Sequence, residues 1–386
     1  MNIILLGSVN PLDFDLSQED FNRVDGLKFG RSVPVSDLAI SLAELGHKVT
    51  VIGIASIAEN ELSVTTQNGV TLIFIRGRGK EKLKAITFYS FERKSMLSQI
   101  ASLGADVVHA HWTYEYALTA QDSALPHVIT VHDEPWEILK GFRNIYFFLR
   151  LLNSIRVRLR RSENLVFVSE YLRTLWIKRM FTTGGSVIPN MNRLAKSNSK
   201  ESQRSNNIVT VGNTDRRKNI RCLLAAWEIA ILANPNLQLH LVGPGLGKGD
   251  PLAQEFENKF EVDQVIWHGS ITRHELSEIY STCNVLVHPS QWESFGLIYL
   301  EAFAFDLGVI TLAKSGSTAE VIGDAGLILG DDSPKSLSDA ILNLTSNQTL
   351  LDQLTVNGRA RLKQYSPNQV TRSYISLYER IMGAPK

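Results

Sequence analysis

Short apolar segments, each suited to a buried strand, alternate with segments of helical periodicity along almost the whole chain. This alternation predicts an α/β protein whose parallel sheets are covered by helices on both faces. The first set of expected strands comprises residues 2–7, 48–54, 71–75, 106–109, 127–131 and 165–168. The second set comprises residues 208–211, 237–242, 265–267, 285–288, 309–311 and 326–329.

One polar segment separates the two sets of strands. Residues 195–207 are rich in Ser, Asn, Lys and Arg and contain no aromatic residue, which is typical of a linker. The linker divides the chain into two doubly wound, Rossmann-like domains, residues 1–194 and 208–365, each long enough to bury a core. Because such sheets bind ligands at the carboxyl ends of their strands, we expect a cleft between the domains.

The composition excludes several classes of partner and location. A formal net charge of +1 gives no reason to expect nucleic acid as a partner. The two cysteines, Cys222 and Cys283, lie in apolar segments without metal-ligand spacing, which indicates a reducing compartment. The apolar run at residues 2–7 is short for a signal peptide, and no run reaches membrane-spanning length. We therefore expect a cytoplasmic protein, of unknown oligomeric state.

Two carboxylates lie eight positions apart after the expected strand 285–288. Glu293 belongs to a loop, Gly296 marks the start of a helix, and Glu301 lies within its first turns. Such a strand–loop–helix unit directs backbone N–H groups and the positive helix end at a ligand, which favours phosphate. Gly296 lacks a Cβ and allows close approach, and Glu301 can accept a sugar hydroxyl. The pattern predicts a nucleotide-sugar site, with two ordinary surface glutamates as the alternative.

These residues also carry a family resemblance. The segment from Glu293-Ser294-Phe295-Gly296-Leu297 to Glu301, preceded by His288-Pro289-Ser290, resembles the paired-glutamate signature of the retaining glycosyltransferases of family 4. Segments 106–112, 130–133 and 187–190 are similar to first-domain landmarks of that family, and segments 211–219 and 241–245 to second-domain ones. The resemblance implies a GT-B fold, with a C-terminal helix of about residues 366–386 packed on the first domain.

The resemblance also implies how a donor is held. Glu301 would bind the ribose hydroxyls and Glu293 the donor sugar near its reacting end. Glu293 need not be a nucleophile, because retention in this family is usually explained by same-face attack, with a phosphate oxygen taking the acceptor's proton. His268-Gly269-Ser270 would border the base through its backbone. The other residues expected to contact the donor are Phe295, Gly296, Leu297, Ile298, Gly30 and Asn213.

Basic residues are expected at the start of another helix, whose apolar positions are Ile220, Leu223, Leu224, Trp227 and Ile231. Cations aimed at a diphosphate act where charge develops as the glycosidic bond breaks, so Lys218 and Arg217 are expected to stabilise the leaving group. The family pattern has an arginine where this chain has Asn213. Either Arg216 or Arg217 compensates, or Lys218 and the backbone of residues 296–298 bind the phosphate alone.

Histidines follow or occupy two expected strands. His132 ends the strand 127–131 and precedes Asp133, so we expect both to point into the cleft and His132 to donate to the sugar or acceptor, or to orient either. A purely structural His132 is the alternative. His109 and His111 are expected to face opposite sides of their strand, which argues against a shared metal site. His111 is assigned to the core or to the acceptor side of the cleft.

No metal or cofactor is expected apart from the nucleotide-sugar co-substrate. Asp13-Phe14-Asp15 mimics a metal-binding Asp-x-Asp, but it lacks supporting context and we interpret it as solvated. The glycine-rich segment 243–247 follows a strand, yet no helix with a matching glycine and no phosphate-binding lysine follow it. It is therefore predicted to be a turn rather than a dinucleotide site.

Residues 140–161 interleave bulky apolar side chains with arginines. Such a segment can lie on an anionic membrane surface, and peripheral contact would make a lipid-linked acceptor plausible. An ordinary amphipathic helix packed on the first domain explains the pattern equally.

Taken together, the residues and the resemblance predict a metal-independent, retaining glycosyltransferase. It would move a sugar from a nucleoside-diphosphate sugar to a sugar, glycan or lipid-linked acceptor in polysaccharide or glycoconjugate synthesis. The alternatives are a sugar-nucleotide epimerase on the same fold and a non-catalytic sugar-nucleotide-binding protein. The donor's base and sugar, the acceptor and the linkage are left open.

Overall fold

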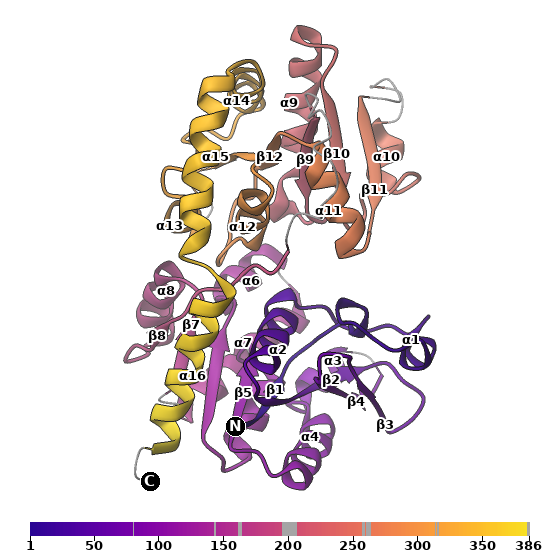
Figure 1. The fold of residues 1–386 in the computed structure, drawn as a ribbon, viewed down its shortest axis with the longest axis vertical. Coiled ribbons are helices and arrows are strands. Elements are labelled where there is room, and N and C mark those ends of the chain that lie inside the picture. Colours follow the sequence, from indigo (N-terminus) through magenta and orange to yellow (C-terminus); the bar gives the residue numbers. More distant parts are fainter. Residues whose placement is uncertain are drawn as a thin grey trace. The chain divides into compact units, whose positions relative to one another are not determined.

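The structure is a computed structural model that describes residues 1–79, 81–142, 144–160, 164–194, 207–256, 259, 264–312, 314 and 316–383. The chain forms two compact units (Figure 1). The first unit comprises Met1–Met191 and Pro367–Lys386, and the second comprises Asn192–Ser366. The expected linker at 195–207 lies outside the described residues except for Asn207, which begins a strand.

The first unit contains an eight-stranded sheet in the order β3-β4-β2-β1-β5-β6-β7-β8. Its strands are β1 (Asn2–Leu6), β2 (Lys48–Ala55), β3 (Glu61–Thr65), β4 (Thr71–Arg76), β5 (Val107–His111), β6 (His127–Val131), β7 (Leu165–Phe167) and β8 (Ser186–Val187). The pairs are parallel except at the edge, where β3 runs antiparallel to β4. The expectation of purely parallel sheets is wrong there, because the short turn between β3 and β4 permits only a hairpin.

Helices flank this sheet and carry its chain connections. They are η1 (Pro11–Asp13), α1 (Gln18–Val24), α2 (Val33–Glu44), α3 (Glu81–Ile86), α4 (Ser90–Leu103), α5 (Glu115–Asp122), α6 (Pro135–Phe142), α7 (Ile145–Leu159), α8 (Glu170–Met180) and α16 (Pro367–Gly383). Gly46 follows α2 with φ +82°, a left-handed conformation that glycine adopts without a steric penalty. This conformation ends α2 and lets the chain turn directly into β2.

The C-terminal helix belongs to the core of the first unit. Figure 1 shows α16, in yellow, beside the strands of the N-terminal part of the chain. Its buried side chains are Val370, Thr371, Tyr374, Leu377 and Tyr378. Val370, Tyr374, Leu377 and Tyr378 pack in one apolar cluster with side chains from β1, β2, β4 and α2. The last residues of the helix expected at 366–386, residues 384–386, lie outside the described residues.

The second unit contains a six-stranded parallel sheet in the order β11-β10-β9-β12-β13-β14. Its strands are β9 (Asn207–Val211), β10 (Gln238–Val242), β11 (Val265–Gly269), β12 (Val285–His288), β13 (Gly308–Leu312) and β14 (Gly326–Leu329). Ile208 of β9 pairs with Val285 of β12, and the order of the strands reverses at this pair. Ligands bind open α/β sheets at such a switch point, beyond the carboxyl ends of the strands.

The helices of the second unit are η2 (Arg216–Lys218), α9 (Ile220–Ala233), α10 (Pro251–Phe256), α11 (Arg273–Thr282), α12 (Leu297–Ala304), α13 (Thr318–Ile322), α14 (Pro334–Ser346) and α15 (Gln348–Lys363). The sequence predicted Arg217 and Lys218 at the start of the helix that is now α9. They lie instead in the 3-10 turn η2, which precedes it. Asn219, with φ +56°, separates the turn from α9. Asparagine is among the residues that adopt this left-handed conformation most readily.

Helix α12 begins after Gly296 as expected. Its buried residues are Tyr299, Leu300, Ala302 and Phe303, whereas Leu297 and Ala304 are only half-buried. Helix α12 contacts both β13 and α15. Because it is covered on two sides, helix α12 does not bury a single apolar stripe.

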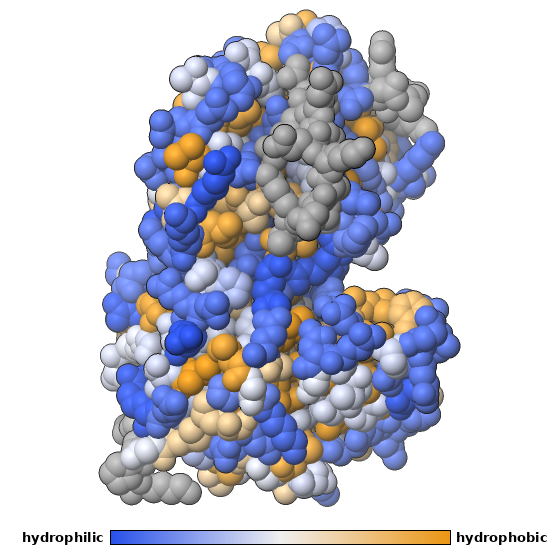
Figure 2. Space-filling view, in the orientation of Figure 1, coloured by the Kyte–Doolittle hydropathy of each residue, from blue (hydrophilic) through white to orange (hydrophobic). Residues whose placement is uncertain are grey.

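None of the described helices has the length and apolar content needed to cross a membrane. On the face drawn in Figure 2, hydrophilic residues predominate and apolar residues form scattered patches.

Candidate functional site

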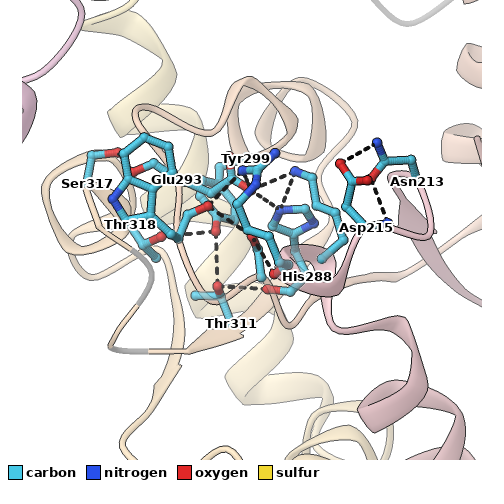
Figure 3. A network of polar contacts seen from close by, with 12 residues as sticks. Asn213, Asp215, His288, Glu293, Tyr299, Thr311, Ser317 and Thr318 are labelled. Carbon is cyan, nitrogen blue, oxygen red and sulfur yellow. Dashed lines mark hydrogen bonds and ion pairs between the residues drawn. The ribbon is translucent and has the colours of Figure 1, made fainter. Parts of the chain in front are cut away.

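Glu293 is the centre of a charged cluster at the switch point of the second unit (Figure 3). Its Oε1 lies 2.6 Å from Lys218 Nζ, 3.0 Å from His288 Nε2 and 3.4 Å from Arg217 Nη1. Lys218 and Arg217 follow β9, and His288 is the last residue of β12. Glu293 is only 7% exposed. The cluster thus combines residues from both sides of the strand-order reversal around one buried carboxylate.

The charges of the cluster fix its protonation state. Burial alone would raise the pKa of Glu293, but Lys218, the His288 hydrogen bond and Arg217 hold that pKa well below its ordinary value. Burial, aided by Lys218, lowers the pKa of His288, and the contact with Glu293 opposes this only in part. His288 is therefore neutral near pH 7, and because a carboxylate only accepts, Nε2–H of His288 donates to Glu293.

Backbone contacts hold Glu293 in place. The side chain of Arg217 donates to the backbone carbonyl of Trp292 over 2.8 Å, and the amide of Ser317 donates to that of Glu293 over 3.0 Å. Gly316 has φ +71°, and a Cβ there would lie 2.2 Å from the Glu293 carbonyl oxygen. A side chain at Gly316 would therefore displace the backbone that positions the carboxylate.

Gly296 is required for a reason different from the one expected. It has φ +88°, and a Cβ would lie 2.4 Å from Tyr299 Cε2, so the ring of Tyr299 occupies the space beside it. The Tyr299 hydroxyl lies 3.0 Å from Thr311 Oγ1 and 3.1 Å from Thr318 Oγ1, which anchors the first turn of α12 (Figure 3). The N-cap residue of α12 is Gly296, so no side-chain hydrogen bond caps the start of this helix. The leading amides of the helix are thus those of a bare N-terminus.

The remaining donor-side residues differ in what their side chains do. Tyr280 donates to Glu301 Oε2 over 2.8 Å, so a buried hydroxyl orients that carboxylate. The Phe295 side chain is 3% exposed and packs edge-on against Tyr365, while Leu297 and Ile298 are half-buried. Because Phe295 belongs to the core, only its backbone is available to a ligand.

Two other expected donor contacts lie in turns at the carboxyl ends of β9 and β11. Asn213 donates through Nδ2 to Asp215 over 2.8 Å and accepts from the Asp215 amide, which closes the turn after β9. Gly269 has φ +69°, and its amide and carbonyl bond to Leu246 and Gly243. Ser270, which follows it, is exposed.

The arginine missing at position 213 has a counterpart in the cluster. Arg217 reaches Glu293, whereas Arg216 lines a separate cavity of about 610 Å³ together with Thr214, Asp215 and Glu255. Of the two sequence alternatives, Arg217 is the one in the cluster. Its Nε is buried and has no hydrogen-bond partner among the described residues.

In the first unit, three histidines form a stack. The rings of His109 and His111 lie 4.4 Å apart, and those of His111 and His132 lie 5.1 Å apart. The expectation that His109 and His111 face opposite sides of β5 is wrong, because side chains two positions apart in a strand share a face. His111 Nδ1 lies 2.8 Å from His132 Nε2. His111 therefore orients His132.

The stack is uncharged and tied to the C-terminal helix. Burial lowers the pKa of both His109 and His132 to about 3, and burial with the neighbouring histidines lowers the pKa of His111 well below its ordinary value. His109 bonds through Nδ1 to the Tyr378 hydroxyl at 2.6 Å and through Nε2 to Thr130 Oγ1 at 2.7 Å. The C-terminal helix thus contributes directly to the order of these rings.

Asp133 and Gly30 line one cavity of the first unit. Asp133 accepts from the Tyr114 hydroxyl, and burial raises the pKa of its carboxyl group against the effect of Arg150. A Cβ on Gly30 would lie 2.8 Å from Ser8 Cβ, so a glycine is needed beside the end of β1. Asp13 is not solvated as expected, since its side chain is 3% exposed and paired with Arg31 at 2.8 Å.

The segment 140–161 spans the end of α6 and all of α7, and its Arg143 and Arg161 lie outside the described residues. Helix α7 buries Leu151, Asn153, Ser154 and Val157 against the first unit. It also exposes large apolar side chains, namely Ile145, Phe148, Leu152 and Leu159. The segment is thus a packed amphipathic helix with a second apolar face exposed.

The buried histidines make stability depend on pH. His109 has a pKa of about 3 when folded and about 6.5 when unfolded, so below pH 6.5 the unfolded chain binds a proton that the folded chain does not. The contribution is fully favourable above pH 6.5 and declines as pH falls toward 3. We expect His109→Gln to reduce the slope of unfolding free energy against pH by about 1 kcal/mol per pH unit between pH 5 and 6.5.

Urea unfolding at several pH values measures this slope. His274→Gln is the control, because His274 is exposed and its side chain lies 3.8 Å from Glu278 on the surface of α11. A slope unchanged by His109→Gln would mean that His109 is already protonated in the folded protein.

Sequence reasoning missed several residues of these sites. His288 stands in the motif quoted for the resemblance, but its place one residue before a proline gave no sign that it bonds to Glu293. Tyr280 and Ser317 lie 21 and 24 positions from their partners, in other elements. Only the sheet topology brings them to the cluster. The described part of the chain contains no cluster of three side chains that could hold a metal ion.

Two family models match the chain, and they meet at the border between the two units. Residues 32–191 match Glycosyltransferase Family 4, and residues 192–361 match Glycosyl transferases group 1. The chain belongs to this family of GT-B glycosyltransferases. It is an enzyme, a glycosyltransferase of the hexosyltransferase type.

Similar proteins have been named or solved. The chain is 24% identical over 312 residues to an uncharacterized glycosyltransferase of Methanocaldococcus jannaschii, covering 78% of this chain and 83% of the relative. It is 29% identical over 170 residues to the O-antigen chain mannosyltransferase B of Escherichia coli, covering 44% of each. The sucrose-phosphate synthase of Thermosynechococcus elongatus matches with a TM-score of 0.78 and 19% identity over 100% of both chains. Anabaena HepE in complex with UDP and glucose matches with a TM-score of 0.73 and 15% identity, covering 98% of this chain and 99% of that one.

Proposed function

We propose that the chain is a retaining, metal-independent glycosyltransferase that moves a sugar from a nucleoside-diphosphate sugar to a sugar, glycan or lipid-linked acceptor. The observation that carries this proposal is the cluster of Lys218, Arg217 and His288 around Glu293, at the switch point of the second unit. The N-terminus of α12 begins three residues after Glu293. Two cations and a helix N-terminus at one switch point suit a diphosphate.

The donor-side residues take separate roles. Lys218, Arg217 and the amides of residues 296–298 stabilise the diphosphate as it gains negative charge in the transition state. Glu301, oriented by Tyr280, accepts the ribose hydroxyls, and Glu293 holds the donor sugar. Asn213, Gly269 and Ser270 contribute backbone or turn contacts, whereas Gly30 lines the cavity of the first unit.

The cations also account for metal-independent chemistry. A divalent metal in a sugar-transfer site neutralises the charge of the leaving diphosphate. Lys218 and Arg217 supply two positive charges at the place where that charge develops. Retention follows if the acceptor attacks from the side that the diphosphate leaves, with a phosphate oxygen taking the proton.

His132, Asp133 and His111 form the acceptor side of the proposed site. Because His132 is neutral at physiological pH, it can donate one hydrogen bond to a hydroxyl but does not act as a cation. His111 fixes its orientation through the contact between His111 Nδ1 and His132 Nε2.

The proposed setting is polysaccharide or glycoconjugate synthesis in the cytoplasm. It is supported by likeness to an O-antigen chain mannosyltransferase, and by the two free cysteines, Cys222 and Cys283, which suit a reducing compartment. Peripheral membrane contact through residues 140–161 is also proposed, because α7 exposes Ile145, Phe148 and Leu152.

A panel of nucleotide sugars tests the function. A true donor raises the melting temperature in proportion to its occupancy, and it is slowly cleaved to nucleoside diphosphate in water. The anomeric configuration of the released sugar, read by NMR, tests retention, and undiminished rates in EDTA test metal independence. Conversion of the sugar nucleotide to an epimer would establish the epimerase instead. Binding without cleavage or transfer would leave a non-catalytic sugar-nucleotide-binding protein.

A further inference from the structure

A cavity of about 580 Å³ opens in the first unit at the carboxyl ends of β1, β2, β4 and β5. Ser8, Ser56, Gly77 and Trp112 follow these strands, in that order, and all four line the cavity. Aromatic side chains form part of the wall. This is the position in which an open α/β sheet binds a ligand, and it lies in a different unit from Lys218 and Glu293.

The cavity wall has an excess of positive charge. Among the described residues, its charged members are Lys28, Arg31, Lys84, Arg150, Glu115 and Asp133. Four cations thus face two carboxylates. Arg31 is neutralised by Asp13, which bonds to its guanidinium at 2.8 and 3.1 Å. Lys28, Lys84 and Arg150 then remain beside Glu115 and Asp133, which leaves the wall with one net positive charge.

Among the cations of the wall, Arg150 has a guanidinium group whose orientation is fixed by its neighbours. Its guanidinium carbon lies 3.7 Å from the centre of the Tyr114 ring and 5.6 Å from that of Tyr146, and Nη1 donates to the Tyr146 hydroxyl at 3.4 Å. The stacking fixes the plane of the guanidinium before a ligand arrives. An ordered guanidinium presents a planar fork of donors that matches phosphate oxygens.

Apart from the weak bond from Nη1 to Tyr146, no hydrogen bond from the Arg150 guanidinium to the described part of the chain is present. Nε of Arg150 is buried without a hydrogen-bond partner. Among the described residues no carboxylate oxygen lies within ion-pair distance of Arg150, although Asp133 and Glu115 are near enough to raise the pKa of its guanidinium. Both oxygens of Asp133 accept from the Tyr114 hydroxyl, at 2.9 and 3.0 Å. A buried donor left unfilled is costly, and a bound anion would satisfy it.

We propose that this cavity binds an acceptor that carries a phosphate group, with the phosphate on Arg150. The proposal rests on the proposed function and names the substrate class of its acceptor side. Trp112 and Asp133 line the cavity, and the ring of Trp112 lies 5.0 Å from that of His132. Trp112 thus connects the wall of the cavity with the histidine that we place on the acceptor side.

The phosphate can belong to a soluble sugar phosphate or to a lipid-linked diphosphate sugar. Helix α7 carries Arg150 on the cavity side and exposes Ile145, Phe148 and Leu152. Both sources share the group that Arg150 recognises, so binding experiments with both kinds of probe separate them.

Binding of defined probes tests the proposal. The probes are glucose, glucose 6-phosphate, glucuronate and a farnesyl-diphosphate-linked N-acetylglucosamine, titrated calorimetrically into the full chain. We expect one of the two phosphate probes to bind at least tenfold more tightly than glucose and glucuronate. Arg150→Gln should weaken that probe by about ten- to a hundredfold, the usual effect of losing hydrogen bonds between charged groups. Arg150→Lys should restore only part of the affinity, because a single ammonium lacks the planar fork.

Arg156→Gln is the matched control. Arg156 lies on the same helix and stacks on Phe88 at 4.5 Å, but it does not line the cavity. Its loss should change affinity less than twofold to threefold, and circular dichroism melting of each variant reports whether it is folded. Preference for glucose 6-phosphate identifies a soluble acceptor, and preference for the farnesyl probe a lipid-linked one.

Three results would overturn the proposal. If the phosphate probes bind no better than glucose, the cavity does not select a phosphate group. If Arg150→Gln leaves their affinity unchanged, Arg150 does not bind the phosphate. Equal weakening of nucleoside diphosphate and phosphate probes by Arg150→Gln would assign the cavity to the donor. Failure of the proposed function would give a different result from these three. In that case no nucleotide sugar would be cleaved, regardless of how tightly the phosphate probes bind.

Discussion

Replacing Lys218 by alanine is expected to lower turnover by about two to three orders of magnitude, because one preorganised charge-stabilising group is lost at the leaving diphosphate. The ammonium lies 2.6 Å from Glu293, on the turn after β9, and its side chain is 16% exposed. The effect should appear mainly in kcat, because the charge on the diphosphate grows only as the bond breaks. Steady-state rates of nucleoside diphosphate release measure it.

Arg221→Ala is the control for Lys218→Ala. Arg221 lies in the first turn of α9, where its exposed side chain pairs with Glu255. Its loss should leave kcat within a few-fold of the parent. Retention of activity within a few-fold by Lys218→Ala itself would remove Lys218 from the mechanism, and a change confined to KM would make it a ground-state binding group.

Replacing Glu293 by glutamine is expected to lower the free energy of unfolding of the second unit by about 3 kcal/mol, because removal of one partner leaves buried charge uncompensated. The glutamine keeps the shape of the side chain but no longer neutralises Lys218 and Arg217. It also loses the carboxylate that we propose holds the donor sugar, so activity should fall with stability. Urea unfolding followed by tryptophan fluorescence measures the first effect.

The stability difference between the parent and Glu293→Gln should depend on pH in a defined direction. The pKa of Glu293 is depressed in the folded chain, so its contribution is fully present above the ordinary pKa and is lost as pH falls through the folded value. The difference should therefore persist from pH 7 to pH 5 and shrink below about pH 4. A constant difference down to pH 2 would show that neutralisation of the two cations is not its source.

Glu255→Gln is the matched control for this prediction. Glu255 pairs with Arg221 on the surface, where both side chains are well exposed, and such pairs contribute about 1 kcal/mol or less. A loss for Glu293→Gln no larger than that of Glu255→Gln would mean that the cluster relaxes into water rather than remaining enclosed.

The strand-and-helix pattern was predictable because its signals are local. Apolar runs of strand length mark β6 and β14 with correct ends, and Gly296 precedes α12 as expected. The edge strand β3 was missed because buried and exposed residues alternate along it, so it lacks the apolar run that marked the other strands. Lys218 and Glu293 could be singled out because a motif carries them, although 75 residues separate them.

Geometry between distant segments was not predictable in the same way. Tyr280 bonds to Glu301, His111 to His132, and Tyr378 of α16 to His109, and each of these contacts joins residues from different elements. The unpaired Nε of Arg150 likewise depends on what surrounds it in the folded chain. The periodicity of 140–161 indicated a basic amphipathic helix, but not which arginine turns toward a cavity. The rings of His109 and His111 were assigned to opposite faces of β5, an error that the two-residue period of a strand corrects.

The sequence by itself determined the succession of strands and helices, the two doubly wound halves and the paired-glutamate motif, because periodicity, glycine positions and residue spacing act within a few residues along the chain. The tertiary structure alone decided which cations surround Glu293, that three histidines share one neutral stack, and that Arg150 lines a cavity with its Nε unpaired. These outcomes depend on strand order and on burial, which brings charges from remote segments together and shifts their pKa values.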